Sequence, residues 1–141
     1  MNFIDFNTFQ NVDIRVGEII KAETYPEAKK PALKLWINFG QHIGEKKSSA
    51  QITDHYKPND LIGKKILAVI NLKPRQIGNF ISEVLVLGVP DMKEEGVFLV
   101  VPDNETKIGS RLYYYFLFLH DNEAYIVIRN FHSRQFEFAL L

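Results

Sequence analysis

Apolar and polar residues alternate along much of residues 12–102, which is the pattern of β-strands that bury one face and expose the other. The clearest run covers residues 33–39, where apolar side chains occupy every second position until Gly40 ends the run. Alternation or apolar enrichment predicts further strands at residues 12–16, 46–52, 65–72, 80–88 and 97–101. No long helical pattern follows any of these runs, so we expect no βαβ unit.

Short helices and sharp corners separate the predicted strands. Phe3, Phe6 and Phe9 recur at a regular spacing, which predicts a short amphipathic helix lying over one end of the fold. Residues 58–60, Pro-Asn-Asp, begin like a helix and predict a single helical turn. Gly17 interrupts an alternating run, which predicts a β-bulge or a sharp bend. Five or six short strands with such corners are typical of a small closed barrel, so we predict an all-β fold.

The end of the chain has a different composition. All eight glycines and all six prolines lie in residues 1–109, whereas residues 112–141 hold nine of the 18 aromatic residues. The apolar runs 112–119 and 125–131, joined by a five-residue connection, predict a β-hairpin, and residues 136–141 predict a further strand. Three interpretations remain open: a hairpin docked on the barrel, a lineage-specific binding element, or translated downstream sequence that selection never shaped for this fold.

Composition excludes several kinds of chemistry. The chain has 141 residues, the length of one domain, and it has no cysteine, which excludes thiol nucleophiles, disulfides, thiolate zinc sites and iron–sulfur clusters. Seventeen Lys and Arg balance 17 Asp and Glu, so there is no general attraction to polyanions. The charges are unevenly placed, however: residues 61–82 carry four basic residues and no acid, and residues 83–105 carry six acids and one lysine. A nucleic-acid-binding surface must therefore be local.

Signals for secretion, membrane insertion and catalysis are absent from the sequence. The first ten residues lack the basic and apolar regions of a signal peptide, and the longest apolar run has eight residues, where a membrane span needs about 20. We therefore expect a cytoplasmic protein. Nucleophile-elbow, dinucleotide-binding and phosphate-loop motifs are missing, and the four histidines, of which His42 and His55 are predicted to be exposed, lack metal-ligand spacing. We expect no catalytic residue, no metal and no cofactor, and hence a binding module rather than an enzyme.

Two motifs are candidate binding segments. KKSSAQIT, residues 46–53, brings two lysines into a strand of small hydrogen-bonding residues, which leaves room for a sugar–phosphate backbone. NLKPRQIGNFISEVLVLG, residues 71–88, holds Lys73 and Arg75 on either side of Pro74, whose fixed φ stiffens the turn. Arginine can grip a phosphate or stack on a base, and the neutral side chains that follow suit ribose and base edges. An ordinary edge strand and a solvated basic hairpin are the alternatives.

Three further segments add to the two motifs above: VDIRVGEII (12–20), YPEAKKPALKLWINFG (25–40) and TKIGSRLY (106–113). Together, the five segments closely resemble the CsaA family, whose tRNA-binding domain also occurs in methionyl-tRNA synthetases. The resemblance covers residues 1–112. It implies a five-stranded oligonucleotide-binding (OB) barrel in a homodimer that binds tRNA. An alternative role that it implies is an export-related chaperone that holds unfolded or presequence peptides in grooves of the dimer. Residues 113–141 depart from the family and form an aromatic-rich extension of unknown role.

The resemblance also places eight side chains of the two motifs near the binding surface. Lys46, Lys73 and Arg75 are predicted to contact phosphates, and Ser49, Gln51, Asn79 and Ser82 to contact ribose or bases, with Ser48 beside them in the first motif. Trp36 and Phe80 are the candidates for base stacking, and packing in the dimer interface is the alternative for both. Trp36 lies opposite the core face of a lysine-rich strand, and a two-fold dimer would cover this apolar side chain.

Overall fold

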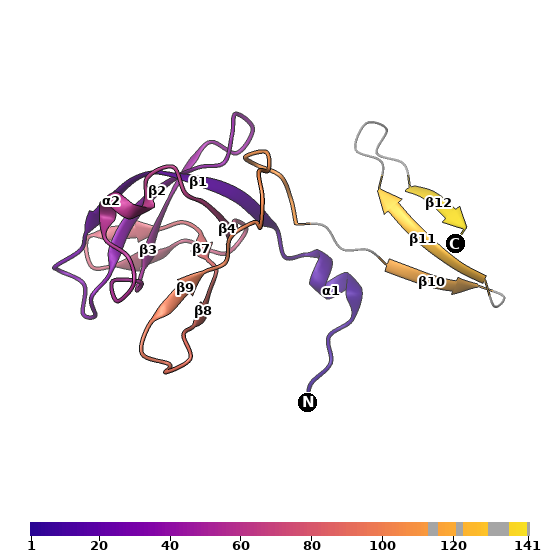
Figure 1. Cartoon of the computed structure of the whole chain (residues 1–141), viewed down its shortest axis with the longest axis horizontal. Coiled ribbons are helices and arrows are strands. Elements are labelled where there is room, and N and C mark those ends of the chain that lie inside the picture. The colour runs from indigo at the N-terminus through magenta and orange to yellow at the C-terminus, as the bar shows by residue number, and fades with distance from the viewer. Residues whose placement is uncertain (113–115, 121–122, 130–135, 141) are drawn as a thin grey trace.

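The protein is described by a computed structural model that covers residues 1–112 and the backbone of three later strands, at residues 116–120, 123–129 and 136–140. Within these residues the chain is mostly β-structure (Figure 1), which confirms the predicted fold class. The elements of the first 112 residues are α1 (Phe6–Gln10), β1 (Ile14–Thr24), β2 (Leu33–Asn38), β3 (Glu45–Ala50), α2 (Pro58–Leu61), β4 (Lys65–Val69), β5 (Arg75–Ile77), β6 (Phe80–Ser82), β7 (Leu85–Val86), β8 (Gly88–Pro90) and β9 (Val97–Leu99).

Five strands form one sheet in the order β3-β2-β1-β4-β7, which curls into a nearly closed barrel (Figure 1). The long strand β1 serves both halves of the barrel, because its first part pairs antiparallel with β4 and its second part with β2. The seam between β3 and the segment before β7 is bridged where the Lys47 carbonyl accepts the N–H groups of Glu83 at 2.8 Å and of Val84 at 3.3 Å. The predicted five-stranded OB barrel is confirmed.

The alternation in β2 determines which face of the sheet turns inward. Leu33, Leu35 and Ile37 are each at most 1% exposed, and the residues between them are half-buried. They pack against Ile19 of β1 and Ile66 of β4, which are both fully buried. Each such side chain stabilises the fold by about 1.5–3 kcal/mol when buried, and a register shift of one residue would expose all of them.

Gly17 is required by core packing and not by a β-bulge. The β-bulge in β1 lies between Ile19 and Lys21, where the register with β2 shifts, whereas Gly17 pairs regularly with β4. A Cβ atom at Gly17 would lie 2.5 Å from Ile37 Cγ2 and 2.6 Å from Phe39 Cε1. The prediction of a bulge or bend at Gly17 is therefore wrong: the residue is small because core side chains pack directly against its backbone.

Both predicted helices are present and short. α1 follows Asp5, whose carboxylate accepts the Thr8 N–H at 2.6 Å, and α2 begins at Pro58. The helix predicted from the phenylalanine spacing starts at Phe6 rather than at Phe3, and none of its residues is buried. Among the residues that the structure describes, no helix has the length and apolar character needed to cross a membrane.

Hydrogen bonds tie the chain to β1 as far as Leu112. The Gly109 N–H donates to the Val16 carbonyl at 2.8 Å, and the Val16 N–H donates to the Ser110 carbonyl at 2.9 Å. The Leu112 N–H then donates to the Ile14 carbonyl at 2.8 Å. This segment therefore supplies backbone partners to β1 and belongs to the barrel.

The later strands β10 (Phe116–His120), β11 (Glu123–Arg129) and β12 (Phe136–Leu140) form an antiparallel sheet in that order. The predicted hairpin and further strand are confirmed. The five-residue connection is wrong, because His120 pairs with Glu123 and the strands extend into it. The three interpretations of the role of this extension remain predictions.

Candidate nucleic-acid interface

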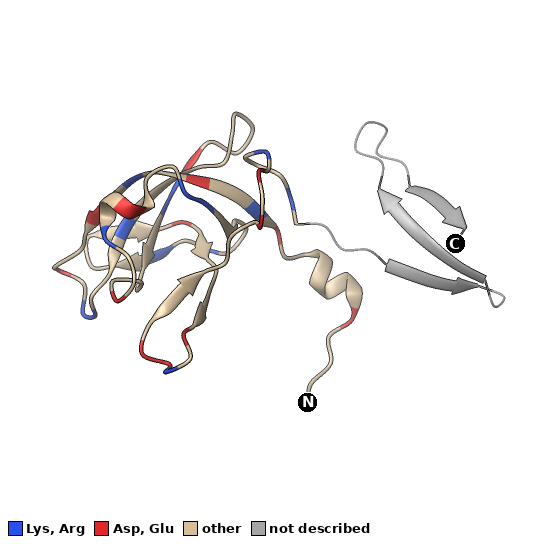
Figure 2. Ribbon diagram, viewed as in Figure 1, with Lys and Arg blue, Asp and Glu red and all other residues tan. Residues whose placement is uncertain are grey.

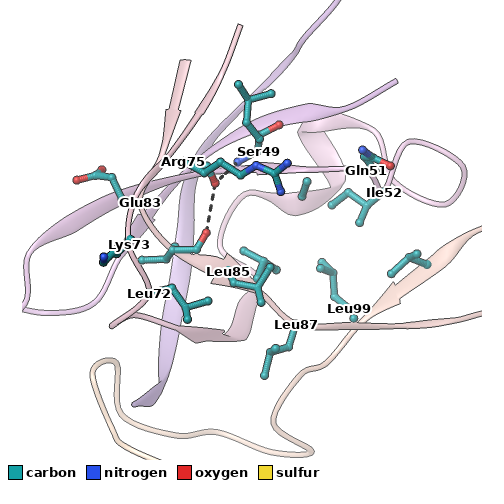
Figure 3. A pocket seen from close by; sticks show the side chains of 17 residues that line it. Ser49, Gln51, Ile52, Leu72, Lys73, Arg75, Glu83, Leu85, Leu87 and Leu99 are labelled. Carbon is teal, nitrogen blue, oxygen red and sulfur yellow. Dashed lines mark hydrogen bonds between the residues drawn. The ribbon is translucent and has the colours of Figure 1, made fainter. Parts of the chain in front are cut away.

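The two predicted binding motifs meet around one pocket, with a cavity volume of about 520 Å³ (Figure 3). The first motif contributes the end of β3 and the residues after it, and the second contributes residues 72, 73, 75, 77 and 82–88. These segments come together because β6 and β7 contact β3 at the barrel seam. Five of the eight predicted site residues line the pocket: Ser49, Gln51, Lys73, Arg75 and Ser82.

Apolar side chains line the rest of this pocket. Ile52 and Leu99, which belong to the barrel core, are 3% and 7% exposed. Leu72 and Leu85 are about half exposed, at 50% and 51%. In Figure 3 the Arg75 side chain extends to the side of the pocket where the polar residues of the first motif lie, opposite these leucines. The pocket thus combines an apolar lining with a polar and basic rim.

Strand register and one hydrogen bond place Lys34 in a row with three side chains of the pocket rim. Lys34 of β2 lies opposite Ser49 of β3. The Ser49 N–H donates to Ser82 Oγ at 3.1 Å, and Ser82 of β6 lies opposite Arg75 of β5. The row Lys34, Ser49, Ser82 and Arg75 therefore crosses β2, β3, β6 and β5, and joins residues from three separate parts of the sequence.

The three side chains predicted to contact phosphates differ in whether a carboxylate is paired with them. Lys73 and Arg75 are exposed and form no ion pair with any residue that the structure describes. Lys46 Nζ, by contrast, lies 3.8 Å from a carboxylate oxygen of Glu83, whose other oxygen accepts the Lys47 N–H at 2.9 Å. An unpaired cation binds a phosphate without first losing a carboxylate partner, so Lys73 and Arg75 are better placed for this than Lys46.

Ser48 and Asn79 are held by groups of the protein itself. Ser48 is 1% exposed, and its hydroxyl donates to the Val84 carbonyl at 3.0 Å. Buried in this way, Ser48 closes the barrel seam and does not face solvent. Asn79 is exposed, but its Oδ1 lies 3.1 Å from the hydroxyl of Tyr25. Neither residue lines the pocket.

Trp36 and Phe80, the predicted stacking residues, pack on each other within one chain. Their ring centroids lie 5.7 Å apart at an interplanar angle of 73°. Phe80 is 8% exposed and also meets the ring of Tyr25 at 5.9 Å. These rings form a second small core on the outer face of β2. The apolar patch at Trp36 is thus covered in part by its own chain.

Tyr25 supports the site in a way that its own sequence neighbourhood does not indicate. This side chain is 2% exposed, and its hydroxyl donates to the Ile77 carbonyl in the turn between β5 and β6. Gly78 in that turn has a φ of +57°, and a Cβ atom there would lie 2.5 Å from the same hydroxyl. Tyr25 therefore holds the turn that joins the strands of Arg75 and Ser82. No local pattern indicates this contact, because its partners lie 52 residues apart.

The side of the barrel that carries β8 and β9 is acidic and includes His55. The loop of this hairpin carries Asp and Glu residues (Figure 2). His55, expected as a plain surface residue, stacks on Phe98 at 4.3 Å, and its Nε2 lies 2.8 Å from Asp91 Oδ2. This hydrogen bond is the main reason why the pKa of Asp91 lies below its usual value. Among the described side chains, no three His, Asp or Glu residues gather as metal ligands.

An OB barrel with basic and polar side chains around a pocket at the seam belongs to a class of barrel domains that bind oligonucleotides or oligosaccharides. A family model described as "Putative tRNA binding domain" matches residues 14–111. The chain belongs to this tRNA-binding-domain family, and within it to the CsaA proteins.

Three comparisons show the extent of the similarity. The chain is 51% identical to the CsaA chaperone protein of Picrophilus torridus, with a TM-score of 0.74, over 79% of this chain and 100% of that one. It is 42% identical to the chaperone CsaA of Bacillus anthracis, again with a TM-score of 0.74 and coverage of 79% and 100%. It is 37% identical over 112 residues to the methionine–tRNA ligase of Methanocaldococcus jannaschii, which is 79% of this chain but 17% of that enzyme. The chain thus spans about one sixth of the length of the curated relatives it matches.

Proposed function

We propose that this protein binds tRNA without catalysing a reaction, through the rim of the pocket at the barrel seam. The observation that carries the proposal is the meeting of two exposed cations, which have no ion-pair partner in the described part of the chain, with three hydroxyl or amide side chains from distant segments. Membership of the tRNA-binding-domain family supports tRNA as the ligand. The match to the methionine–tRNA ligase of Methanocaldococcus jannaschii covers 17% of that enzyme, so the domain is a small part of the ligase.

In this proposal the rim cations bind phosphates and the neutral side chains contact ribose or bases. Lys73 and Arg75 bind phosphates directly, and Lys46 adds to them once it leaves Glu83. The side chains assigned to ribose and base contacts are Ser49, Gln51, Asn79 and Ser82. Ser48 has the indirect role of holding β3 against the seam through its bond to a backbone carbonyl.

The salt dependence of tRNA affinity tests the proposal. If four to six phosphates are neutralised, log affinity falls with log salt at a slope of about −3 to −5. The double variant Lys73→Gln/Arg75→Gln should flatten the slope by roughly two units, because each cation accounts for roughly one. A matched control is Lys93→Gln/Lys107→Gln, which removes the same charge from exposed sites away from the pocket. A slope near zero for the unaltered protein, or a double variant that behaves like its control, would contradict the proposal.

A second candidate function is the binding of unfolded or presequence peptides. The apolar lining of the same pocket, with Leu72 and Leu85 half exposed, favours it, since an extended peptide could bury these side chains. The similar proteins from Picrophilus torridus and Bacillus anthracis are described as chaperones. A competition experiment tests whether the two ligands share this pocket: a bound presequence peptide should displace tRNA if both use it. We place both activities in the cytoplasm.

We further propose that the protein is a homodimer. Val89 and Phe98 lie opposite each other in the β8–β9 hairpin and are 52% and 46% exposed. Such an exposed apolar pair needs cover, and a two-fold dimer is the commonest way to provide it. Sedimentation equilibrium should show twice the monomer mass at micromolar concentration. A monomer mass under these conditions would rule out the proposed homodimer.

We also propose that residues 1–112 are the tRNA-binding unit and residues 113–141 an extension to it. The hydrogen bond from the Leu112 N–H to the Ile14 carbonyl supports this division, because it makes residue 112 a backbone partner of β1.

A further inference from the structure

Three lysines lie over the small aromatic core on the outer face of β1, β2 and β3. Lys21 Nζ is 4.3 Å from the ring centroid of Trp36, and Lys34 Nζ is 4.4 Å from that of Tyr25. Lys47 Nζ is 5.6 Å from the ring centroid of Phe80. An ammonium group within about 6 Å of a ring centroid is attracted to the ring face. The rings therefore hold three positive charges on one face of the barrel.

Carboxylate partners compete little with a ligand for these ammonium groups. Lys34 and Lys47 form no ion pair with any residue in the described part of the chain. Lys21 is paired with Glu23 at 2.8 Å, and both side chains are about half exposed, so water weakens this pair. Lys34 and Lys47 therefore place positive charge without a carboxylate partner, among the described residues, on a chain whose total charge is zero.

The lysine face continues the row of rim residues. Lys34 is itself the first member of that row, and Lys47 lies opposite Trp36, which in turn lies opposite Lys21. Adjacent strands are about 4.8 Å apart, so Lys21 and Lys47 are anchored roughly 10 Å apart on either side of Trp36. The lysine face and the rim residues therefore lie on neighbouring strands of the same barrel.

From this arrangement we infer that Lys21, Lys34 and Lys47 form a second phosphate-binding site, which takes the backbone of the same RNA beyond the pocket rim. The inference rests on the proposed function, because the RNA must first bind at the rim. The rings of Tyr25 and Phe80 are too buried to stack on bases, because they are 2% and 8% exposed. Their task is to fix the long lysine side chains in advance, which lowers the entropy cost of binding.

A lysine site of this kind recognises charge and not sequence. Lysine is a compact point charge, and phosphate contacts carry no sequence information directly. The site should therefore add affinity for any RNA long enough to reach from the rim to β1, and add nothing for a short oligonucleotide that occupies the rim alone.

The first test compares Lys34→Gln/Lys47→Gln with the unaltered protein in tRNA binding at several salt concentrations. Two lost phosphate contacts should flatten the slope of log affinity against log salt by about 1.4–1.8 units. Lys34→Arg/Lys47→Arg, which keeps charge and ring contact, should keep the slope. The control is Lys64→Gln, because Lys64 also lies over a ring, at 6.0 Å from the centroid of Tyr56, but away from this face.

The second test uses Trp36, the one tryptophan of the chain, as a reporter of this face. Its fluorescence should change on addition of tRNA with the midpoint found by filter binding, and a short oligonucleotide confined to the rim should leave it unchanged. If tRNA binds but the fluorescence stays constant and the glutamine double variant keeps the full slope, the lysine site is wrong and the rim proposal stands. If tRNA does not bind the unaltered protein at all, both proposals fail.

Discussion

The substitution Tyr25→Phe removes a single oxygen atom and tests whether the small aromatic core supports the binding site. The hydroxyl is the hydrogen-bond donor to the Ile77 carbonyl and lies 3.1 Å from Asn79 Oδ1. Without it, a partly buried carbonyl loses its donor, which costs about 1–3 kcal/mol of unfolding free energy. For a chain of this length 1 kcal/mol lowers Tm by about 4 °C, so we expect a decrease of about 4–12 °C.

The same substitution should weaken tRNA binding by a separate route. Once the turn between β5 and β6 is no longer held, Arg75 must be ordered when the RNA binds. Ordering one long side chain costs about 0.5–1.5 kcal/mol, which corresponds to an affinity about twofold to twelvefold lower. Binding is measured at 20 °C, well below both unfolding transitions, so that loss of folded protein does not contribute.

Tyr56→Phe is the matched control for this prediction. The Tyr56 hydroxyl accepts the Leu99 N–H at 3.2 Å, so its removal should also lower Tm. Because the Tyr56 hydroxyl bonds to β9 and not to the Ile77 carbonyl, its loss should leave tRNA affinity unchanged. Two results would refute the reasoning: a Tyr25→Phe variant as stable as the unaltered protein, or one that loses stability but binds tRNA as tightly as the control.

Three further predictions follow from the fold. Gly17→Ala should lower the unfolding free energy by about 1–3 kcal/mol, because the new Cβ would overlap Ile37. The loss would appear as a lower urea midpoint, and an unchanged midpoint would show that the core side chains shift to make room. A chain ending at Leu112 should keep its Tm and bind tRNA within tenfold of the full chain, and greater losses in calorimetry or filter binding would make the extension part of the domain. Because the pKa of Asp91 is lowered in the fold, its carboxylate adds stability that is complete above about pH 4 and is lost as pH falls through the lower folded value. Hydrogen-exchange protection in the β8–β9 loop should fall in that range, and an Asp91→Asn variant that shows the same fall would contradict the assignment.

Local patterns in the sequence were enough to predict most of the elements. β2 follows from alternation alone, since Leu33 and Leu35 must share a face of any strand. The turn at Pro58 follows from the fixed φ of proline at a helix start. Gly17 was misjudged for a physical reason: the sequence shows that a side chain is absent, but not whether backbone conformation or a neighbour requires it. Here the neighbour Ile37, 20 positions away, decides.

The candidate site was predictable in part. The motifs at 46–53 and 71–88 were chosen for their residue types, and five of the eight chosen side chains line one pocket. Ser48 was chosen with them because it resembles Ser49 in chemistry, and only strand register shows that one faces the core and the other the rim. Tyr25 was missed because its polar partners are backbone and amide groups that any segment could supply.

The sequence by itself determined the periodicity, the turns and the absence of thiol chemistry, because each depends on residues close together or on composition. The tertiary structure decided which charges act together. Lys34 and Arg75 are 41 positions apart, and they share a row because β2, β3, β6 and β5 lie side by side at the seam. Whether a lysine faces a carboxylate, a ring or open solvent depends on such long-range pairings. A chain with no net charge can therefore present a basic surface only through its fold.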